Sequence, residues 1–198
     1  MADSKGFRLS GTESFEAAVS SLLGSLRVTD PGPPAFQAVV DHVAVGSAIV
    51  ARIQAAAATV TRDTPSITST DAEWMHLTLH RRGPVAVTQD NRTSALRPAE
   101  LFACDNTRPY RIIGAEPSDM TVLCVPRASL GKRADCMGRR TALPISAQDG
   151  IGRLLGCALS GMDEDLPRRG VARTYLRRAP ALATRPWQAH PTACRALS

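Results

Sequence analysis

The sequence has no apolar run that approaches the roughly 20 residues needed to cross a bilayer. Its first ten residues, MADSKGFRLS, have neither the cationic segment nor the apolar segment of a secretory signal peptide. The cysteines are odd in number and scattered, without a C-x-x-C pair: Cys104, Cys124, Cys136, Cys157 and Cys194. These absences predict a cytoplasmic protein with reduced thiols and no membrane association. They argue against a disulfide framework or a zinc knuckle.

Acidic side chains are missing from the last 33 residues, 166–198, which hold seven arginines. Residues 1–165 hold 17 basic and 18 acidic residues, so the formal charge of +6 comes from this tail. Four prolines and the lack of a sustained hydrophobic period predict that the tail is irregular. Because a nucleic-acid-binding domain gathers basic residues on one folded face, we expect no sequence-specific DNA binding by this chain alone.

Residues 14–26 predict a helix, since their apolar side chains fall on one helical stripe. Ser10 and Glu13 have the spacing of a capping box before it. From residue 36 to 125 the pattern changes to short β-rich runs at close spacing. We expect strands at 36–43, 47–54, 58–62, 74–80, 84–89, 92–96, 101–104, 109–113 and 120–125. Asp90 and Asn91 tolerate a positive φ and predict a tight hairpin. Nine short strands without intervening helices predict a mainly β sandwich or barrel.

After Pro126 the helical period returns, with Ser146 and Asp149 as a second cap. An apolar stripe follows, formed by Ile151, Leu154, Leu155, Ala158, Leu159 and Met162. It is more apolar than a helix on a barrel needs, so we expect part of it to cover the barrel and part to contact a second subunit in a weak homodimer. The dimerisation residues are predicted to be Ile151, Leu154, Leu155, Leu159 and Met162. The glycines at 150, 152 and 156 do not fit a dinucleotide-binding loop, and we interpret them as allowing close helix packing.

No metal or catalytic site is expected, and no cofactor. His76 and His80 share one face of a strand but lie four residues apart, about 13 Å, too far to reach one metal ion. There is no G-x-S-x-G and no Cys/His nucleophile motif. Cys104 and Cys124 fall within strands, where a buried and inert thiol is the usual outcome.

The barrel lining offers candidates for gripping a small organic ligand by stacking and hydrogen bonding. The predicted ligand-binding residues are Trp74, His76, Arg108 and Tyr110. An alternative stays open for each: Trp74 and Tyr110 can be core aromatics, and Arg108 can pair with Asp105 to brace a turn.

Several short motifs recur in a fixed order between residues 77 and 127. They are L-x-L-x(3)-G-x-V-x-V-x-Q-D (Leu77 to Asp90), L-R-P-x-x-L (Leu96 to Leu101), D-x-x-R-P-Y (Asp105 to Tyr110) and V-P-R (Val125 to Arg127). Over roughly residues 14–163 the chain resembles the N-terminal cupin-like domain of AraC/XylS-type transcription regulators, in the AraC-binding-like subgroup. The resemblance implies a cupin-like jelly-roll barrel that senses an effector, with a leading helix, C-terminal dimerising helices and a separate helix-turn-helix domain.

Two departures from this resemblance matter. The family usually has P-G-D where this chain has Pro98-Ala99-Glu100, so alanine occupies a turn that glycine normally builds. The expected DNA-binding domain is also missing, and we expect a truncated or frame-shifted regulator whose meaningful sequence ends near Asp165; the alternative is a real, flexible basic tail. The predicted layout is an N-terminal helix and linker (1–35), a barrel (36–127), a helical dimerisation segment (128–165) and an irregular tail (166–198). A small cupin-type enzyme, an isomerase or dioxygenase, is the alternative function.

Overall fold

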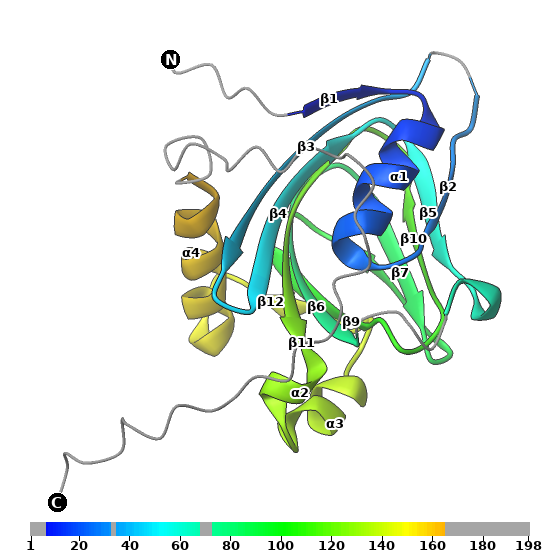
Figure 1. Ribbon diagram of the computed structural model, residues 1–198. Coiled ribbons are helices and arrows are strands. Elements are labelled where there is room, and N and C mark those ends of the chain that lie inside the picture. The colour runs from blue at the N-terminus through cyan, green and yellow to red at the C-terminus, as the bar shows by residue number, and fades with distance from the viewer. Residues whose placement is uncertain (1–6, 33–34, 68–72, 165–198) are drawn as a thin grey trace, which may run out of the picture.

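Two antiparallel sheets form the walls of a barrel in the computed structural model, which describes residues 7–32, 35–67 and 73–164 (Figure 1). The seven-stranded sheet contains, in spatial order, β1 (Phe7–Ser10), β3 (Gln37–Val45), β4 (Ala48–Ala55), β11 (Ser118–Pro126), β6 (Trp74–Arg82), β9 (Glu100–Asp105) and β12 (Ile145–Ser146). The five-stranded sheet contains β2 (Arg27–Thr29), β5 (Ala58–Arg62), β10 (Tyr110–Gly114), β7 (Val85–Gln89) and β8 (Arg92–Leu96). This confirms the predicted mainly β jelly-roll barrel.

All nine predicted strands are present, and their ends lie within two residues of the predicted ends. Three strands were not predicted: β1, β2 and β12, of 4, 3 and 2 residues. Segments this short show too few alternations for a period of two to be recognised. They form because each lies along the edge of an existing sheet and pairs with a longer strand: β3, β5 and β9 respectively.

The hairpin between β7 and β8 forms where the sequence predicts it. Asp90 and Asn91 have φ values of 53° and 59°, and Gln89 pairs with Arg92 on either side of them. Two consecutive left-handed residues make the turn whose twist matches that of the flanking strands. The turn places Asp90 beside Arg92, and Arg92 Nη2 lies 3.0 Å from Asp90 Oδ2.

The leading helix, α1 (Thr12–Leu23), lies over the interior of the barrel, as Figure 1 shows. Its predicted C-terminal end at Leu26 is wrong, because Gly24 has a φ of 90° and ends the helix. The predicted capping box is also wrong: the N-cap is Gly11, and no side chain caps the helix. Phe15, Val19 and Leu23 face inward and belong to the main core.

Four helical segments complete the described part of the chain: a 3-10 turn (Thr64–Ser66), α2 (Arg127–Leu130), α3 (Arg133–Gly138) and α4 (Gly150–Glu164). The predicted cap of Ser146 and Asp149 is wrong, because α4 begins four residues after Ser146; Ser146 Oγ instead donates to Asp149 Oδ2 over 3.1 Å in the segment before the helix. The predicted tail, 166–198, lies outside the described residues. No helix in the ranges described above combines the length and apolar character that crossing a membrane requires.

Helix α4 lies on the outer face of the seven-stranded sheet, and two glycines let it pack closely against β12 and the residue after it, which confirms the interpretation of Gly152 and Gly156. A Cβ atom added to Gly152 would lie 1.9 Å from the carbonyl oxygen of Ser146, and one on Gly156 would lie 2.9 Å from the Cβ of Ala147. Beyond the glycines, Leu155 and Leu159 pack with the outward-facing leucines of β6 and β9. Because α4 covers this face, β6 is buried on both sides.

Candidate functional site

A cavity of about 70 Å³ lies inside the barrel, between the two sheets and α1. Since one water molecule requires roughly 10–15 Å³ of such a volume, the cavity can hold about five waters or a very small organic molecule. Aliphatic and aromatic side chains form most of its wall. The helix contributes Phe15, Val19 and Leu23, and the strands contribute Ile53, Val60, Ile112, Met120 and Val122. Polar groups are few and lie mainly near one end.

That polar end is built by three adjacent strands. His76 on β6 lies directly opposite Cys104 on β9 and Cys124 on β11. Directly opposed residues of antiparallel strands project from the same face, so all three side chains point to the barrel interior. Across the barrel, the ring of Tyr110 meets the His76 imidazole edge to face, with 6.3 Å between ring centroids. Thr78 stands two residues along β6 and also lines the cavity.

His76 is the residue whose environment is most unusual. Its side chain is 3% exposed, and its Nε2 atom has no hydrogen-bond partner within the described part of the chain. Burial, together with the nearby positive charge of Arg62, lowers the pKa of His76 to about 4 against the opposing effect of Asp105. The imidazole is therefore neutral at pH 7 and offers one donor and one acceptor nitrogen.

Arg62 and Asn106 lie behind this end of the cavity and are almost completely buried. Arg62 Nε donates to the carbonyl oxygen of Asn106 at 2.7 Å, and Nη1 donates to that of Ser25 at 2.6 Å. These bonds join β5 to the end of β9 and to the segment after α1. Both polar atoms of the Asn106 side chain lack a hydrogen-bond partner among the described residues. The Asn106 amide also lies against Gly24, where an added Cβ atom would be only 2.6 Å from Asn106 Nδ2.

Burial holds three further titratable groups in their neutral forms: Cys104 and Tyr110 in the cavity wall, and Cys124 beside it. Burial, followed by the charge of Asp105, raises the pKa of the Cys104 thiol far above its ordinary range, and burial raises that of Cys124 to about 12. Burial also raises the pKa of Tyr110 well above its ordinary value. In the part of the chain that the structure covers, no three His, Cys, Asp or Glu side chains are grouped so that they could hold a metal ion.

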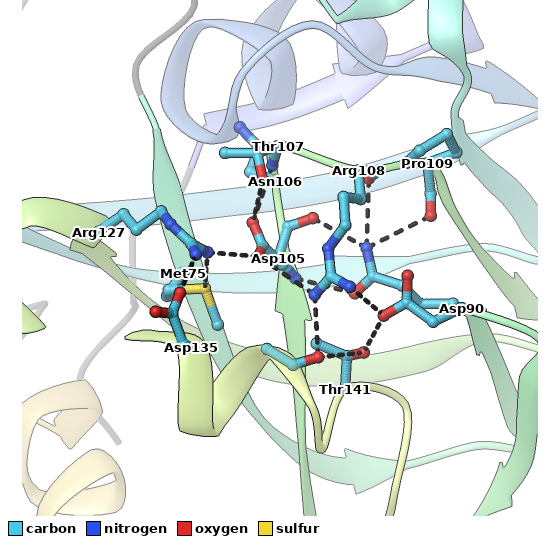
Figure 2. A network of polar contacts seen from close by, with 12 residues as sticks. Met75, Asp90, Asp105, Asn106, Thr107, Arg108, Pro109, Arg127, Asp135 and Thr141 are labelled. Carbon is cyan, nitrogen blue, oxygen red and sulfur yellow. Dashed lines mark hydrogen bonds and ion pairs between the residues drawn. The ribbon is translucent and has the colours of Figure 1, made fainter. Parts of the chain in front are cut away.

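A second polar cluster lies on the surface beside α2 and α3 and is centred on Asp105 (Figure 2). The Asp105 carboxylate, 2% exposed, accepts from Arg127 at 2.5 Å and from Arg108 at 3.2 Å. Arg108 also reaches Asp90, with 2.7 Å between Nη1 and Oδ2, and Arg127 reaches Asp135 at 2.7 Å. Arg108 and Arg127 each have two acidic partners, so the cluster ties the hairpin, β9 and the two short helices together.

The structure brings together two of the four predicted ligand-binding residues. His76 and Tyr110 line the cavity. Trp74 is half-buried and packs against the main core, as the core alternative holds, without being part of the cavity wall. Arg108 pairs with Asp105 in the surface cluster, as the bracing alternative holds. Tyr110 is both a core aromatic and a wall residue.

Sequence reasoning missed Arg62 and the wall that α1 contributes. The signal for Arg62 was present: Ala58, Val60 and Arg62 alternate on β5, and the first two line the cavity. A charged residue on an otherwise apolar face is commonly assigned to solvent, which is why the pattern concealed it. No pattern within residues 14–26 could show that the helix would lie over the barrel interior.

The predicted dimerisation stripe divides into two parts on α4. Leu159 is buried and Leu155 is half-buried against the outer leucines of the sheet. Ile151, Leu154 and Met162 are 69%, 64% and 37% exposed. The exposed members lie beside the packed ones around the helix, so they form one continuous apolar strip on the surface.

Residues 15–185 match the family of the AraC-binding-like domain. Among solved structures, the AraC-like transcriptional activator CuxR superimposes with a TM-score of 0.66 at 21% identity, over 82% of this chain and 61% of that one. The cupin domain of an XRE family transcriptional regulator from Enterobacter cloacae has a TM-score of 0.36 at 14% identity, over 44% and 94% of the two chains. A cupin superfamily protein from Desulfitobacterium hafniense has 0.37 at 13%, over 50% and 81%. No curated protein matches the chain in sequence.

Proposed function

The chain belongs to the AraC-binding-like domain family, and on that premise we propose that its barrel binds a small-molecule effector without catalysing a reaction on it. The observation that carries the proposal is the cavity, with the unpaired Nε2 of His76 in its wall. Concave, mostly apolar pockets with a few polar groups are where proteins bind small molecules. A buried polar atom without a partner is costly, and a ligand that pairs with it recovers that free energy.

Binding rather than chemistry is supported by the protonation states around the cavity. A nucleophilic thiol must ionise near neutral pH, and the pKa values of Cys104 and Cys124 are raised by burial instead. A general base works best with a pKa near the working pH, and burial holds that of His76 near 4. These groups can therefore recognise a ligand, but they are poorly suited to react with it.

A cavity-filling variant tests the proposal. Ala58 lines the cavity, and Ala58→Ile adds three carbon atoms there. Thr59→Ile is the matched control, because the next residue of β5 points to the opposite face. A thermal-shift screen of small neutral and charged compounds should yield at least one that stabilises the wild type and the control but not Ala58→Ile. Compounds that stabilise Ala58→Ile as much as the wild type, or the absence of any stabilising compound, would overturn the sensing role.

We also propose that the exposed strip of Ile151, Leu154 and Met162 contacts a second copy of the chain in a weak two-fold dimer. Burying one leucine is worth about 1.5–3 kcal/mol, so Leu154→Glu should weaken association by at least about tenfold. Arg153→Glu is the control, since it adds a negative charge at an exposed position of α4 about 100° around the helix from Leu154. Sedimentation equilibrium at about 100 μM should show dimer for the wild type and control. A monomeric wild type at that concentration would contradict the proposal.

The role in transcription regulation is the last part of the proposal, and it is supported by the likeness to a protein described as an AraC-like transcriptional activator. The matched region spans 61% of that chain. Residues 1–165 are almost neutral, with 17 basic and 18 acidic residues. We therefore propose that this part senses and dimerises rather than reads DNA, and that gel-shift titrations of the chain will show no preference for its own upstream region over random duplex.

A further inference from the structure

The polar and apolar atoms of the cavity are separated along the barrel. His76, Cys104 and Tyr110 mark one end, where β6 pairs with β9 and the aromatic ring meets the imidazole. Two residues further along β6, Thr78 lies opposite Val122. Beyond that level the wall is formed mainly by aliphatic side chains, among them Ile53 and Met120, which are paired across β4 and β11, and the Ser118 hydroxyl is the one polar side chain at the far end of the described wall. A molecule in this cavity meets a hydrogen-bonding end and an apolar body.

The described wall of the cavity carries no charged side chain that could neutralise an ionic ligand. Among the described residues that line the cavity there is no Asp, Glu, Lys or Arg. The guanidinium nearest to the polar end, that of Arg62, donates to backbone carbonyl oxygens and stands outside the wall. A cation would meet no carboxylate there, and an anion would lose its hydration without gaining a directly bound cation. The cavity therefore favours a neutral ligand.

From these observations we infer that the ligand is a small neutral molecule with an apolar body and one hydrogen-bonding oxygen, which pairs with Nε2 of His76. Short-chain alcohols and short-chain ketones belong to this class and match a cavity of about 70 Å³. Phenol belongs to it by chemistry and needs the wall to widen, because benzene occupies a cavity of about 150 Å³. The inference rests on the proposed effector binding and adds the chemistry of the effector. The neutral imidazole can serve either as donor to a carbonyl oxygen or as acceptor from a hydroxyl group.

Four probes of similar shape separate the chemical possibilities at pH 7: phenol, toluene, benzoate and benzylammonium. Dissociation constants are measured by calorimetry or ligand-observed NMR for the wild type, His76→Phe and His76→Gln. Phenol is expected to be preferred over both ions, and its preference relative to toluene should fall about tenfold in His76→Phe, as expected when a buried hydrogen bond is lost. His76→Gln, which keeps a hydrogen-bonding side chain, should retain part of the preference. In ¹⁵N-labelled wild type, phenol should shift the Nε2 resonance of His76.

Continued binding of toluene to His76→Phe shows that the variant is folded and that its cavity persists. An unchanged preference for phenol in that variant would overturn the role of Nε2. Tighter binding of benzoate or benzylammonium, abolished by Ala58→Ile, would overturn the neutral class while leaving effector binding in the barrel intact. Failure of all four probes to bind would also overturn the inference; the broader screen with Ala58→Ile then decides separately whether the barrel senses any small molecule.

Discussion

Arg127, the first residue of α2, donates through Nη1 to Oδ2 of Asp105 at the end of β9, over 2.5 Å. The pair fixes the chain at the point where it leaves the barrel for its short helices. Burial alone would raise the pKa of Asp105, but hydrogen bonds from Thr107 and the charges of Arg127 and Arg108 outweigh it, and the pKa is lowered. The fold therefore favours the ionised carboxylate.

Removing this charge should destabilise the protein. Asp105→Asn leaves Arg127 and Arg108 without their shared partner, and we expect a loss of about 2 kcal/mol in the free energy of unfolding, below the 3–5 kcal/mol of fully buried pairs because both arginines are partly exposed. The control Asp135→Asn removes the other acidic partner of Arg127. Because the Asp135 side chain is 69% exposed, this change should cost less than about 1 kcal/mol. Urea denaturation at pH 7 measures both, and equal losses would contradict the central place of Asp105.

The turn before β9 stores strain in an alanine. Ala99 has a φ of 64°, in the left-handed region that costs a non-glycine residue about 1–2 kcal/mol. Ala99→Gly should therefore stabilise the fold by about 0.5–1 kcal/mol, after allowing for the greater entropy of glycine in the unfolded chain. Ala86→Gly, in the ordinary extended backbone of β7, should destabilise it instead. Thermal unfolding distinguishes the two, and a lower midpoint for Ala99→Gly would show that the turn is not strained.

Two glycines of the same helix should respond in opposite directions to the same change. In Gly152→Ala the new methyl group would overlap the carbonyl oxygen of Ser146, so α4 must move away from the sheet. We expect a loss of about 1–3 kcal/mol, as for other overpacked sites. Gly161→Ala meets nothing within 4 Å, and the higher helix propensity of alanine should make it neutral or stabilising by up to about 1 kcal/mol. Denaturation midpoints that move together would refute the close contact.

The sequence was most informative where the period is strong and the elements are long. Nine strands and the Asp90-Asn91 hairpin follow from alternation and turn chemistry, because each is decided by residues within one segment. The edge strands β1, β2 and β12 exist only through pairing with distant partners. Such features are decided by tertiary contacts, which a local pattern does not contain.

The candidate site shows the same division. His76 and Tyr110 could be selected from the sequence because both fall on predicted strands and both can stack and form hydrogen bonds. Arg108 was selected for its chemistry, but it pairs with Asp90 and Asp105 on the surface instead of lining the cavity. These pairs depend on how the hairpin folds back, which the local sequence does not show. The unpaired state of Nε2 could not be predicted, since it depends on every neighbour at once.

The last prediction concerns the effect of pH on stability through His76. Its pKa is about 4 in the folded protein because of burial, and the nearby charge of Arg62 adds to this; in an unfolded chain it is near 6.5. Between these values the unfolded state binds more protons, so the free energy of unfolding falls as the pH is lowered from about 6.5 to about 4 and is unaffected above that range. The full loss from this residue is about 3 kcal/mol, at about 1.4 kcal/mol for each factor of ten in proton affinity.

Burial also lowers the pKa values of His42 and His80, so the wild-type curve alone would not isolate His76. His76→Gln does isolate it: the variant keeps a polar side chain but cannot titrate, and its stability should decline less steeply over this range. Urea unfolding of both proteins at half-unit steps from pH 4 to 7.5 measures the difference between their free energies of unfolding. This difference should be constant above pH 6.5 and should change progressively below it. Parallel curves over the whole range would show that His76 is not held neutral by the fold.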